Sequence, residues 1–402
     1  MIASQLDNSK CTLIRKFVNA ICVITMMIGG LANVSFGQSE SATPPTAEQL
    51  KATYLASVEE LKEVIKILER QEALYFHASS EDSFDHKEIW DETAEKSEEI
   101  FSRVKKNAFA LFLSDYKTDE DLVKVIARLS PGLFDSGELD LCYTITKKLV
   151  SLKPNDPGLI RDFARIAILT NDFETAKAYA DDPANKATIA KFSTKEQVLF
   201  AYVDDLKTNF ERELELREKD KSANLPQVEI QILDKGKIVI ELFEDEAPET
   251  VGNFVSLIET GIYDGIIFHR VIKSYLAHAG LMSMNKFEPI GYTIYDECKR
   301  PDRRHHFRGS VAMWCETQDP NTGGAQFYIM HVPAPYLTDS NHTVFGRVIE
   351  GMELVDSLQE TRTINEEERK EEPVLDITPE TIQSIKILRK RDHEYKPNRV
   401  KQ

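Results

Sequence analysis

The histidines and cysteines of this 402-residue chain do not occur at the paired spacings that metal ligands require. We therefore expect no metal and no other cofactor. The strongest remaining candidate for chemistry is Arg270, which lies inside the apolar stretch from Phe268 to Ile272. A lone arginine on a strand is usually solvated or ion-paired, but its guanidinium carries five hydrogen-bond donors that a reacting group can use. The motifs around Arg270 decide between these two roles.

Those motifs resemble the cyclophilins in their residues, their order and their spacing. They are Glu246 to Phe254, with Pro248 suited to a first helical turn, then Gly261 to Gly265, Phe268 to Ile272, Gly309 to Met313, Pro320 to Thr322, Gly324 to Ile329 and Val344 to Val348. Several motifs in one order are far more specific than any single match. The resemblance covers residues 226–390.

The resemblance implies a peptidyl-prolyl cis-trans isomerase, whose substrates are proline-containing polypeptides. Amide resonance opposes rotation about the bond before proline with a barrier of about 18–20 kcal/mol. In the twisted amide the prolyl nitrogen becomes pyramidal and gains a usable lone pair. An arginine beside it can donate a hydrogen bond that exists only in the twisted state, which is the differential binding that catalysis requires. The resemblance gives this role to Arg270. The alternation of side chains along a strand predicts that the neighbouring His269 faces away on the opposite pleat.

The resemblance also implies the remaining site residues. Beside Arg270 the predicted catalytic group contains Gln326, which would contact substrate backbone, and His278. An apolar pocket should bury the proline ring, at roughly 0.8 kcal/mol for each CH2. The predicted substrate-binding residues are Tyr275, Leu276, Phe327, Tyr328, Tyr336, Leu337 and His342, with Tyr336 and His342 at the rim.

This chain departs from the family pattern at several of these positions. Where cyclophilins usually have Phe-Met-x-Gln, it has Tyr275 to His278, so a histidine replaces the glutamine that helps to hold the arginine. The segment from Trp314 to Asp319 is longer than its usual counterpart, so contacts there are not transferable. Histidine in isolation titrates near pH 6.5. A His278 that behaves in this way predicts activity that rises between about pH 5.5 and 7.5.

Alternating apolar residues predict the sheet that must position these groups. Val228, Ile230 and Ile232 alternate with polar residues, and a turn at 234–237 leads into a second alternating run. The resemblance implies a closed antiparallel β-barrel capped by helices over residues 226–390. We expect this domain to fold on its own, with an inserted acidic loop at 366–372 and a flexible tail at 391–402.

Residues 47–220 read instead as an all-α domain. Amphipathic segments recur, and Thr46 with Gln49 and Ser193 with Glu196 form capping-box patterns. Gly137 and Asn171 lie 34 residues apart, each before a helical segment, and that period is the tetratricopeptide one. The sequence leaves open whether this region is tetratricopeptide-like or an irregular bundle.

The N-terminus predicts export. A basic stretch, an apolar run from Phe17 to Ala32 and small residues at Ser35 and Gly37 indicate a signal peptide over residues 1–37, cleaved before Gln38. A linker over 38–46 follows. The protein is then periplasmic or secreted, and it contacts a membrane only if the signal stays uncleaved as an anchor. After cleavage three cysteines remain, and the sequence leaves open whether Cys298 and Cys315 are bridged.

The formal net charge of −17 argues against nucleic acid as a partner. The basic cluster at 303–308 is expected to be a solvated loop. We therefore predict an exported isomerase that assists the folding of its substrates, with a helical domain available for a protein partner. The alternative is a binding module that grips proline-containing segments with negligible catalysis, which the altered 275–278 segment favours.

Overall fold

The computed structural model describes residues 45–77, 82–114, 119–280, 282–283, 286–287, 290–316, 319, 321–338, 342–365 and 370–400. The chain divides into two compact units, residues 1–132 and 133–402. The predicted signal peptide and most of the predicted linker lie outside the described residues. In the ranges above, no helix is both long enough and apolar enough to cross a membrane.

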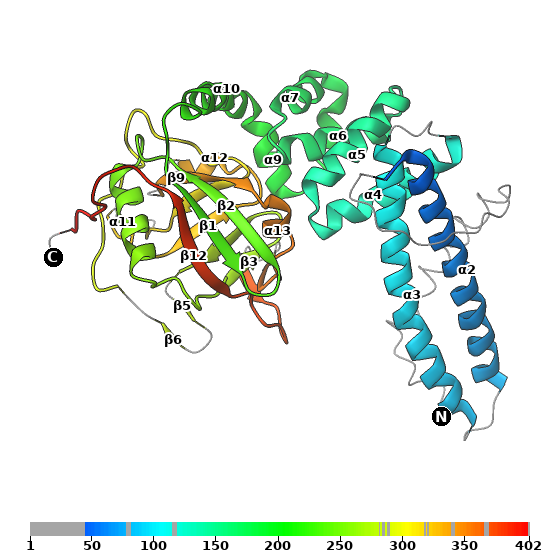
Figure 1. Cartoon of the computed structure of the whole chain (residues 1–402). Coiled ribbons are helices and arrows are strands. Elements are labelled where there is room, and N and C mark those ends of the chain that lie inside the picture. The colour runs from blue at the N-terminus through cyan, green and yellow to red at the C-terminus, as the bar shows by residue number, and fades with distance from the viewer. Residues whose placement is uncertain are drawn as a thin grey trace. The chain divides into compact units, whose positions relative to one another are not determined.

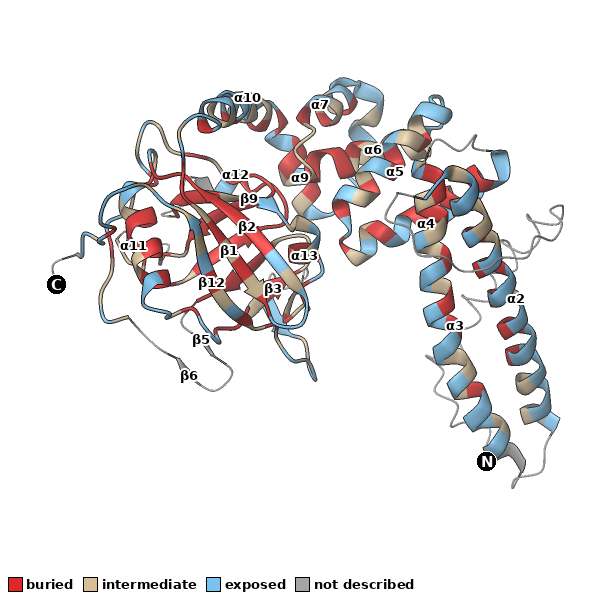
Figure 2. Ribbon diagram, in the orientation of Figure 1, coloured by how far each residue is buried: buried red, intermediate tan, exposed pale blue. Residues whose placement is uncertain are grey.

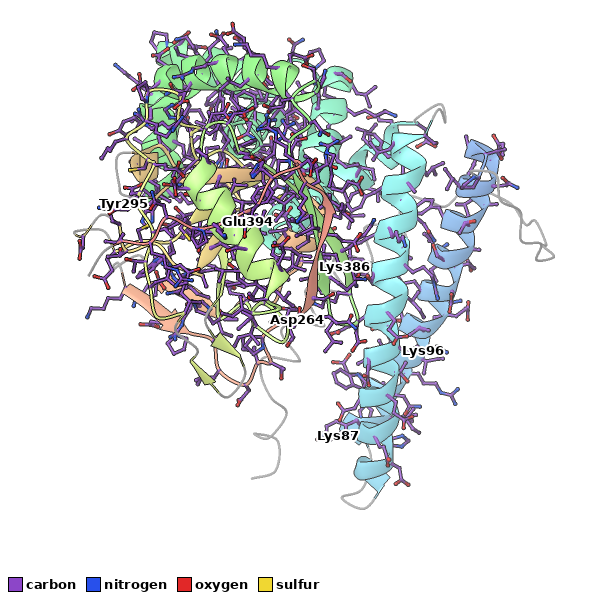
Figure 3. The ribbon with its side chains drawn as sticks, turned by 60° about the vertical axis from the view of Figure 1, so that its left-hand side comes forward. Lys87, Lys96, Asp264, Tyr295, Lys386 and Glu394 are labelled. Atoms are coloured by element: carbon purple, nitrogen blue, oxygen red, sulfur yellow. The ribbon has the colours of Figure 1, made fainter. Side chains whose placement is uncertain are left out.

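The first unit is built on two long helices, α2 (Ala47–His77) and α3 (Asp82–Leu113), which lie side by side (Figure 1). The predicted capping box opens α2, because the Thr46 amide donates to Gln49 Oε1 at 2.8 Å. The buried face of α2 repeats at spacings of three and four residues, through Tyr54, Val58, Leu61, Ile65 and Leu68. On α3, Lys87 and Lys96 are exposed (Figure 3). Helix α4 (Glu120–Ser136) spans the division between the units.

The second unit begins with shorter helices and continues into the sheet. The helices are α5 (Leu139–Leu152), α6 (Pro157–Leu169), α7 (Phe173–Asp181), the 3-10 turn η1 (Pro183–Asn185), α8 (Lys186–Ile189), α9 (Thr194–Ala201) and α10 (Val203–Asp220). Helices begin directly after both Gly137-Glu138 and Asn171-Asp172, and both Gly137 and Asn171 have positive φ. The capping box of Ser193 and Glu196 is present at the start of α9. The tetratricopeptide interpretation itself stays a prediction.

A curled antiparallel sheet follows, as expected from the alternating residues. Its strands are β1 (Gln227–Ile232), β2 (Gly236–Leu242), β3 (Arg270–Ile272), β4 (Leu276–Ala279), β7 (Ser310–Met313), β8 (Phe327–Met330), β9 (Val344–Glu350) and β12 (Ile382–Arg389). Their order in the sheet is β12-β1-β2-β9-β7-β8-β4-β3. Two small separate sheets pair β5 (Met282–Ser283) with β6 (Lys286–Phe287), and β10 (Arg362–Asn365) with β11 (Lys370–Pro373).

Backbone hydrogen bonds join the two ends of this sheet. The segment before β3 pairs with the start of β12, where the Ile382 amide donates to the Ile266 carbonyl at 2.7 Å and the Phe268 amide donates to the Glu380 carbonyl at 2.9 Å. Helices α11 (Pro248–Glu259), α12 (Pro335–Thr338) and α13 (Met352–Asp356) complete the fold. Pro248 is in the first turn of α11, as expected. Figure 2 shows buried positions along the strands and also on the helices.

Two apolar clusters use the two faces of the central strands. Along β8, Phe327 and Ile329 belong to the larger cluster inside the sheet, whereas Tyr328 and Met330 belong to a second cluster on the other face. This division follows from the two-residue period of a strand. The second face is the one that carries Arg270.

Helices α5 to α10 belong to the same compact unit as the sheet, so the change of period near Pro226 lies inside one compact unit. Buried ion pairs hold them there. Arg304, whose side chain is 0% exposed, pairs with Glu213 and Asp220 of α10. Arg308 pairs with Asp140 of α5 and with Asp356 of α13.

The expectation of a solvated loop at 303–308 is therefore wrong for its buried members, Arg304, His306, Phe307 and Arg308. Phe307 lies 4.8 Å from Phe210 of α10 between ring centroids. A guanidinium can be buried where carboxylates of a neighbouring element form ion pairs with it. The carboxylates that pair with Arg304 and Arg308 lie on α5, α10 and α13, far away in the sequence. The local sequence pattern therefore did not indicate these ion pairs.

The C-terminal segment is also more ordered than predicted. Tyr395 is 5% exposed, and its hydroxyl donates to Glu244 at 2.7 Å. The Val400 amide donates to the Thr293 carbonyl at 2.9 Å. The flexible tail expected after residue 391 is thus wrong for residues 391–400. Cys142, Cys298 and Cys315 are buried free thiols.

Candidate active site

One row of directly opposed residues across the sheet defines the site. Arg270 of β3 faces His278 of β4, His278 faces Tyr328 of β8, and Tyr328 faces Ala312 of β7. Opposed residues in an antiparallel ladder point to the same face, so these four side chains share one surface. A tight turn with Ser274 at φ 51° joins β3 to β4 and brings Arg270 and His278 together.

Beside this row lies the apolar cluster in which the predicted pocket residues meet. Leu276 and Tyr328 are buried members of that cluster, and Tyr275 and Leu337 pack against it half-buried. The structure therefore brings together four residues that lie up to 62 positions apart in the sequence. Tyr336 lies next to Tyr275 and is 42% exposed, which agrees with a position at the rim.

The predicted role of Gln326 stays a prediction, whereas that of its neighbour Phe327 does not fit the structure. Gln326 is half-buried, and its carbonyl accepts from the Trp314 amide at 2.9 Å. The backbone passes very close here, since a Cβ on Gly280 would meet the Ala325 carbonyl oxygen at 2.3 Å. Phe327 is 0% exposed and packs edge-to-face on Phe254 inside the sheet. Its assignment to substrate binding is therefore wrong, because it points to the opposite face from Tyr328.

Arg270 is ion-paired and partly exposed. Its Nε donates to Glu371 Oε2 at 2.7 Å and its Nη2 donates to Glu371 Oε1, which makes a bidentate pair with the acidic insertion. The two side chains are 26% and 35% exposed. Sequence reasoning identified an acidic insertion but not its contact with the arginine.

His278 lies beside Arg270 as predicted, but its environment differs from the expected one. It is 3% exposed, and neither ring nitrogen has a hydrogen-bond partner among the described residues. Burial, helped by the charges of His269 and Arg270, lowers its pKa well below the usual 6.5. His278 is consequently neutral across the range where titration was expected, and the predicted rise in activity between pH 5.5 and 7.5 loses its basis.

His269 does not face away from the site. Its ring centroid lies 4.6 Å from that of His278. Strand β3 begins only at Arg270, so the alternation of a strand does not apply to the residue before it. Burial lowers the pKa of His269 to about 4.

Three further side chains complete the wall of the site. His342 is 8% exposed, and its Nδ1 accepts from the Cys315 amide at 3.2 Å, which is a more enclosed position than the expected rim. Sequence reasoning missed Trp314, which stacks on His278 at 6.0 Å, and His306, whose Nε2 lies 2.9 Å from the Tyr328 hydroxyl. The hydroxyl of Tyr328 was the one signal in the sequence that a polar partner was needed.

A cleft of about 250 Å³ lies behind this wall and does not open at Arg270. Tyr202 and Asp205 line it on one side, and Arg303, His306 and Pro335 line it on the other. His306, which lines the cleft, contacts the Tyr328 hydroxyl. We therefore place the candidate site at the Arg270 row and not at this cleft.

Comparison with known proteins identifies the second half of the chain. The family model described as cyclophilin-type peptidyl-prolyl cis-trans isomerase matches residues 227–381. Peptidyl-prolyl cis-trans isomerase B of Bacillus subtilis is 40% identical over 126 residues, which are 31% of this chain and 85% of the relative. This chain belongs to the cyclophilin family. A peptidyl-prolyl cis-trans isomerase of Helicobacter pylori is 38% identical over 129 residues, 32% of this chain and 77% of the relative.

Among solved structures, a cyclophilin-type isomerase of Cryptosporidium parvum is 26% identical and has a TM-score of 0.33. It covers 42% of this chain and 99% of its own. The family membership, with relatives named as isomerases, makes this cyclophilin a peptidyl-prolyl cis-trans isomerase. The helical residues of this chain before Gln227 lie outside the family match.

Proposed function

We propose that this cyclophilin isomerises Xaa-Pro bonds of exported polypeptides and assists their folding, with Arg270 as the catalytic residue. One observation carries the proposal. Arg270 stands in the same ladder row as Tyr328, and the apolar cluster around Tyr328 contains Tyr275, Leu276 and Leu337. A donor and an apolar pocket on one face are the two parts that proline isomerisation needs.

Catalysis then follows from a difference in binding. Proline enters the apolar cluster, where burial of its methylenes contributes roughly 0.8 kcal/mol each. The guanidinium of Arg270 donates to the prolyl nitrogen only when the amide twists and that nitrogen gains its lone pair. A hydrogen bond to a charged donor in a partly buried site contributes about 1.5–3 kcal/mol, so it lowers the barrier and not the ground state.

The helical part of the second unit reaches the edge of this pocket. The Lys195 ammonium, one residue into α9, lies 5.7 Å from the centroid of the Tyr275 ring. A polypeptide that occupies the pocket would therefore meet α9 as well as the sheet. This contact supports a role for the helices in the choice of substrate.

Replacement of Arg270 tests the proposed chemistry. Arg270→Ala should lower kcat/KM on a short Xaa-Pro peptide by at least about tenfold, which equals 1.4 kcal/mol of transition-state stabilisation. Arg300→Ala is the matched control, because Arg300 pairs with Asp302 at an exposed position. Wild-type protein with activity at background, but with measurable affinity for the peptide, would select the binding module instead.

Export rests on the residues before Gln38. Expression in a host that exports the protein should yield a mature chain that begins at Gln38, as mass spectrometry can determine. An intact Met1 chain in the membrane fraction would favour an uncleaved anchor.

A further inference from the structure

The bidentate pair between Arg270 and Glu371 links the isomerase site to a segment of its own. Glu371 lies on β11, opposite Ile364 of β10, in a two-stranded hairpin apart from the main sheet. Planar guanidinium and carboxylate groups that bond through two atoms each fix their mutual orientation as well as their distance.

The base of this hairpin is attached to the strand that carries Arg270. The Thr361 amide donates to the Val271 carbonyl at 3.0 Å, and the Val271 amide donates to Thr361 Oγ1 at 2.7 Å. The Val374 amide closes the hairpin by donating to the Thr361 carbonyl at 3.1 Å. The hairpin that carries Glu371 is therefore bonded to Val271, the residue next to Arg270. These bonds hold the Glu371 carboxylate close to the guanidinium.

The neighbour on the other side does not hold the arginine. His278 faces Arg270 directly, yet both of its ring nitrogens are unpartnered among the described residues. Without an anchor, an arginine side chain loses rotamer entropy when a reaction requires one geometry. At this site the anchor is Glu371.

We propose that Glu371 is a positioning residue for the isomerase reaction, which holds the Nε and Nη2 of Arg270 so that its Nη1 donors face the substrate. The two bonds occupy two of the five guanidinium donors. The remaining donors are available to the twisted amide. This inference rests on the proposed catalytic role of Arg270.

The effect of Glu371 should appear in turnover and not in substrate binding. Glu371→Ala should lower kcat by about tenfold while KM changes less than about twofold, because the proline pocket is intact. Glu371→Gln keeps one acceptor oxygen and should recover part of the loss. Glu372→Ala is the matched control on the same strand, since Glu372 accepts from Asn365 and not from Arg270.

Two further measurements separate positioning from other roles. The Nε–H signal of Arg270 in an NMR spectrum should shift in Glu371→Ala and not in Glu372→Ala. In an Arg270→Ala background, Glu371→Ala should cause no additional loss. Circular dichroism and thermal unfolding establish that each variant is folded.

The outcomes distinguish this inference from the proposed function. If Arg270→Ala abolishes activity but Glu371→Ala leaves kcat unchanged, the positioning role alone is wrong. A rise in kcat/KM for Glu371→Ala would also overturn it, because the carboxylate would then compete with substrate for the guanidinium. Full activity in Arg270→Ala would overturn both.

Discussion

At the scale of single residues, the replacement of glutamine by His278 changes more than one hydrogen bond. A glutamine amide would offer an acceptor to Arg270, whereas the His278 ring lies between His269, Trp314 and Tyr328. It forms part of a wall of rings and is kept neutral by burial. The arginine is held from the other side by Glu371.

This environment predicts how activity depends on pH. Because burial lowers the pKa of His278 well below 6.5, we expect its ring to stay neutral over pH 5.5–7.5, and the isomerase step itself transfers no proton. Wild-type kcat/KM should therefore be flat over that range, and His278→Gln should give an equally flat profile. Both are measured with a short peptide in buffers of constant ionic strength. A wild-type midpoint near pH 6.5 that disappears in His278→Gln would show that His278 is solvated in the working enzyme.

At the scale of elements, the segment at 303–308 joins the helices to the sheet. Arg308 bonds Asp356 at 2.9 Å and Asp140 at 2.7 Å, and its Nη1 also donates to the His331 carbonyl. Arg304 sits 4.1 Å above the Phe243 ring while it pairs with the carboxylates of α10. Removal of one member of such a set leaves an uncompensated buried charge.

The two carboxylates around Arg308 allow a matched comparison. Arg308→Ala should lower the free energy of unfolding of the second unit by about 3–5 kcal/mol, because Asp356 is 5% exposed and loses its counter-charge. Asp140→Ala should cost less than about 1 kcal/mol, because the Asp140 side chain is 58% exposed and Arg308 keeps Asp356.

Urea unfolding at pH 8 is the appropriate measurement. Burial raises the pKa of Asp356 to about 6 although Arg308 lowers it, so Arg308→Ala should raise this pKa further. The loss of stability in Arg308→Ala should therefore grow as the pH increases toward 8, where more of the unpaired carboxyl is charged. Equal, small losses in the two variants would mean that water replaces the guanidinium at Asp356.

At the scale of the whole molecule, the compact unit that contains the site begins at residue 133 and not at the sheet. The sheet alone would expose Phe307 and leave Arg304 and Arg308 without the carboxylates of α5 and α10. The compact unit that contains the family match of residues 227–381 therefore also includes helices α5 to α10. The hairpin of α2 and α3 belongs to the other unit.

Two fragments test this division. A fragment of residues 133–402 should unfold cooperatively and keep the activity of the full chain on a short peptide, because it contains the whole unit. A fragment of residues 225–402 should be less stable, because Phe307 loses its contact with Phe210 and because Arg304 and Arg308 lose the carboxylates of α10 and α5. Calorimetry measures the stability of each fragment, and the peptide assay measures its activity. A stable, active 225–402 fragment would restore the boundary predicted from the change of period.

The sequence by itself determined much of this protein, wherever a property depends on neighbours in the chain. The alternation at Val228, Ile230 and Ile232 and the capping boxes at Thr46 and Ser193 correspond to the strand and helix starts in the structure. The order of the motifs around Arg270 was sufficient to indicate the cyclophilin family, because each motif is a short run of neighbouring residues. The two faces of β8 also follow from its period, and that same rule would have placed Phe327 inside the sheet.

Only the tertiary structure decided the features that depend on residues far apart in sequence. The partner of Arg270 is 101 positions away, and the partners of Arg308 in α5 and α13 are 168 and 48 positions away. The neutral state of His278 likewise depends on rings from three other segments that exclude water. Burial and charge pairing are properties of the folded surroundings. A local pattern names the residue that is able to do the chemistry, and the packing of distant elements sets its charge, its orientation and its partners.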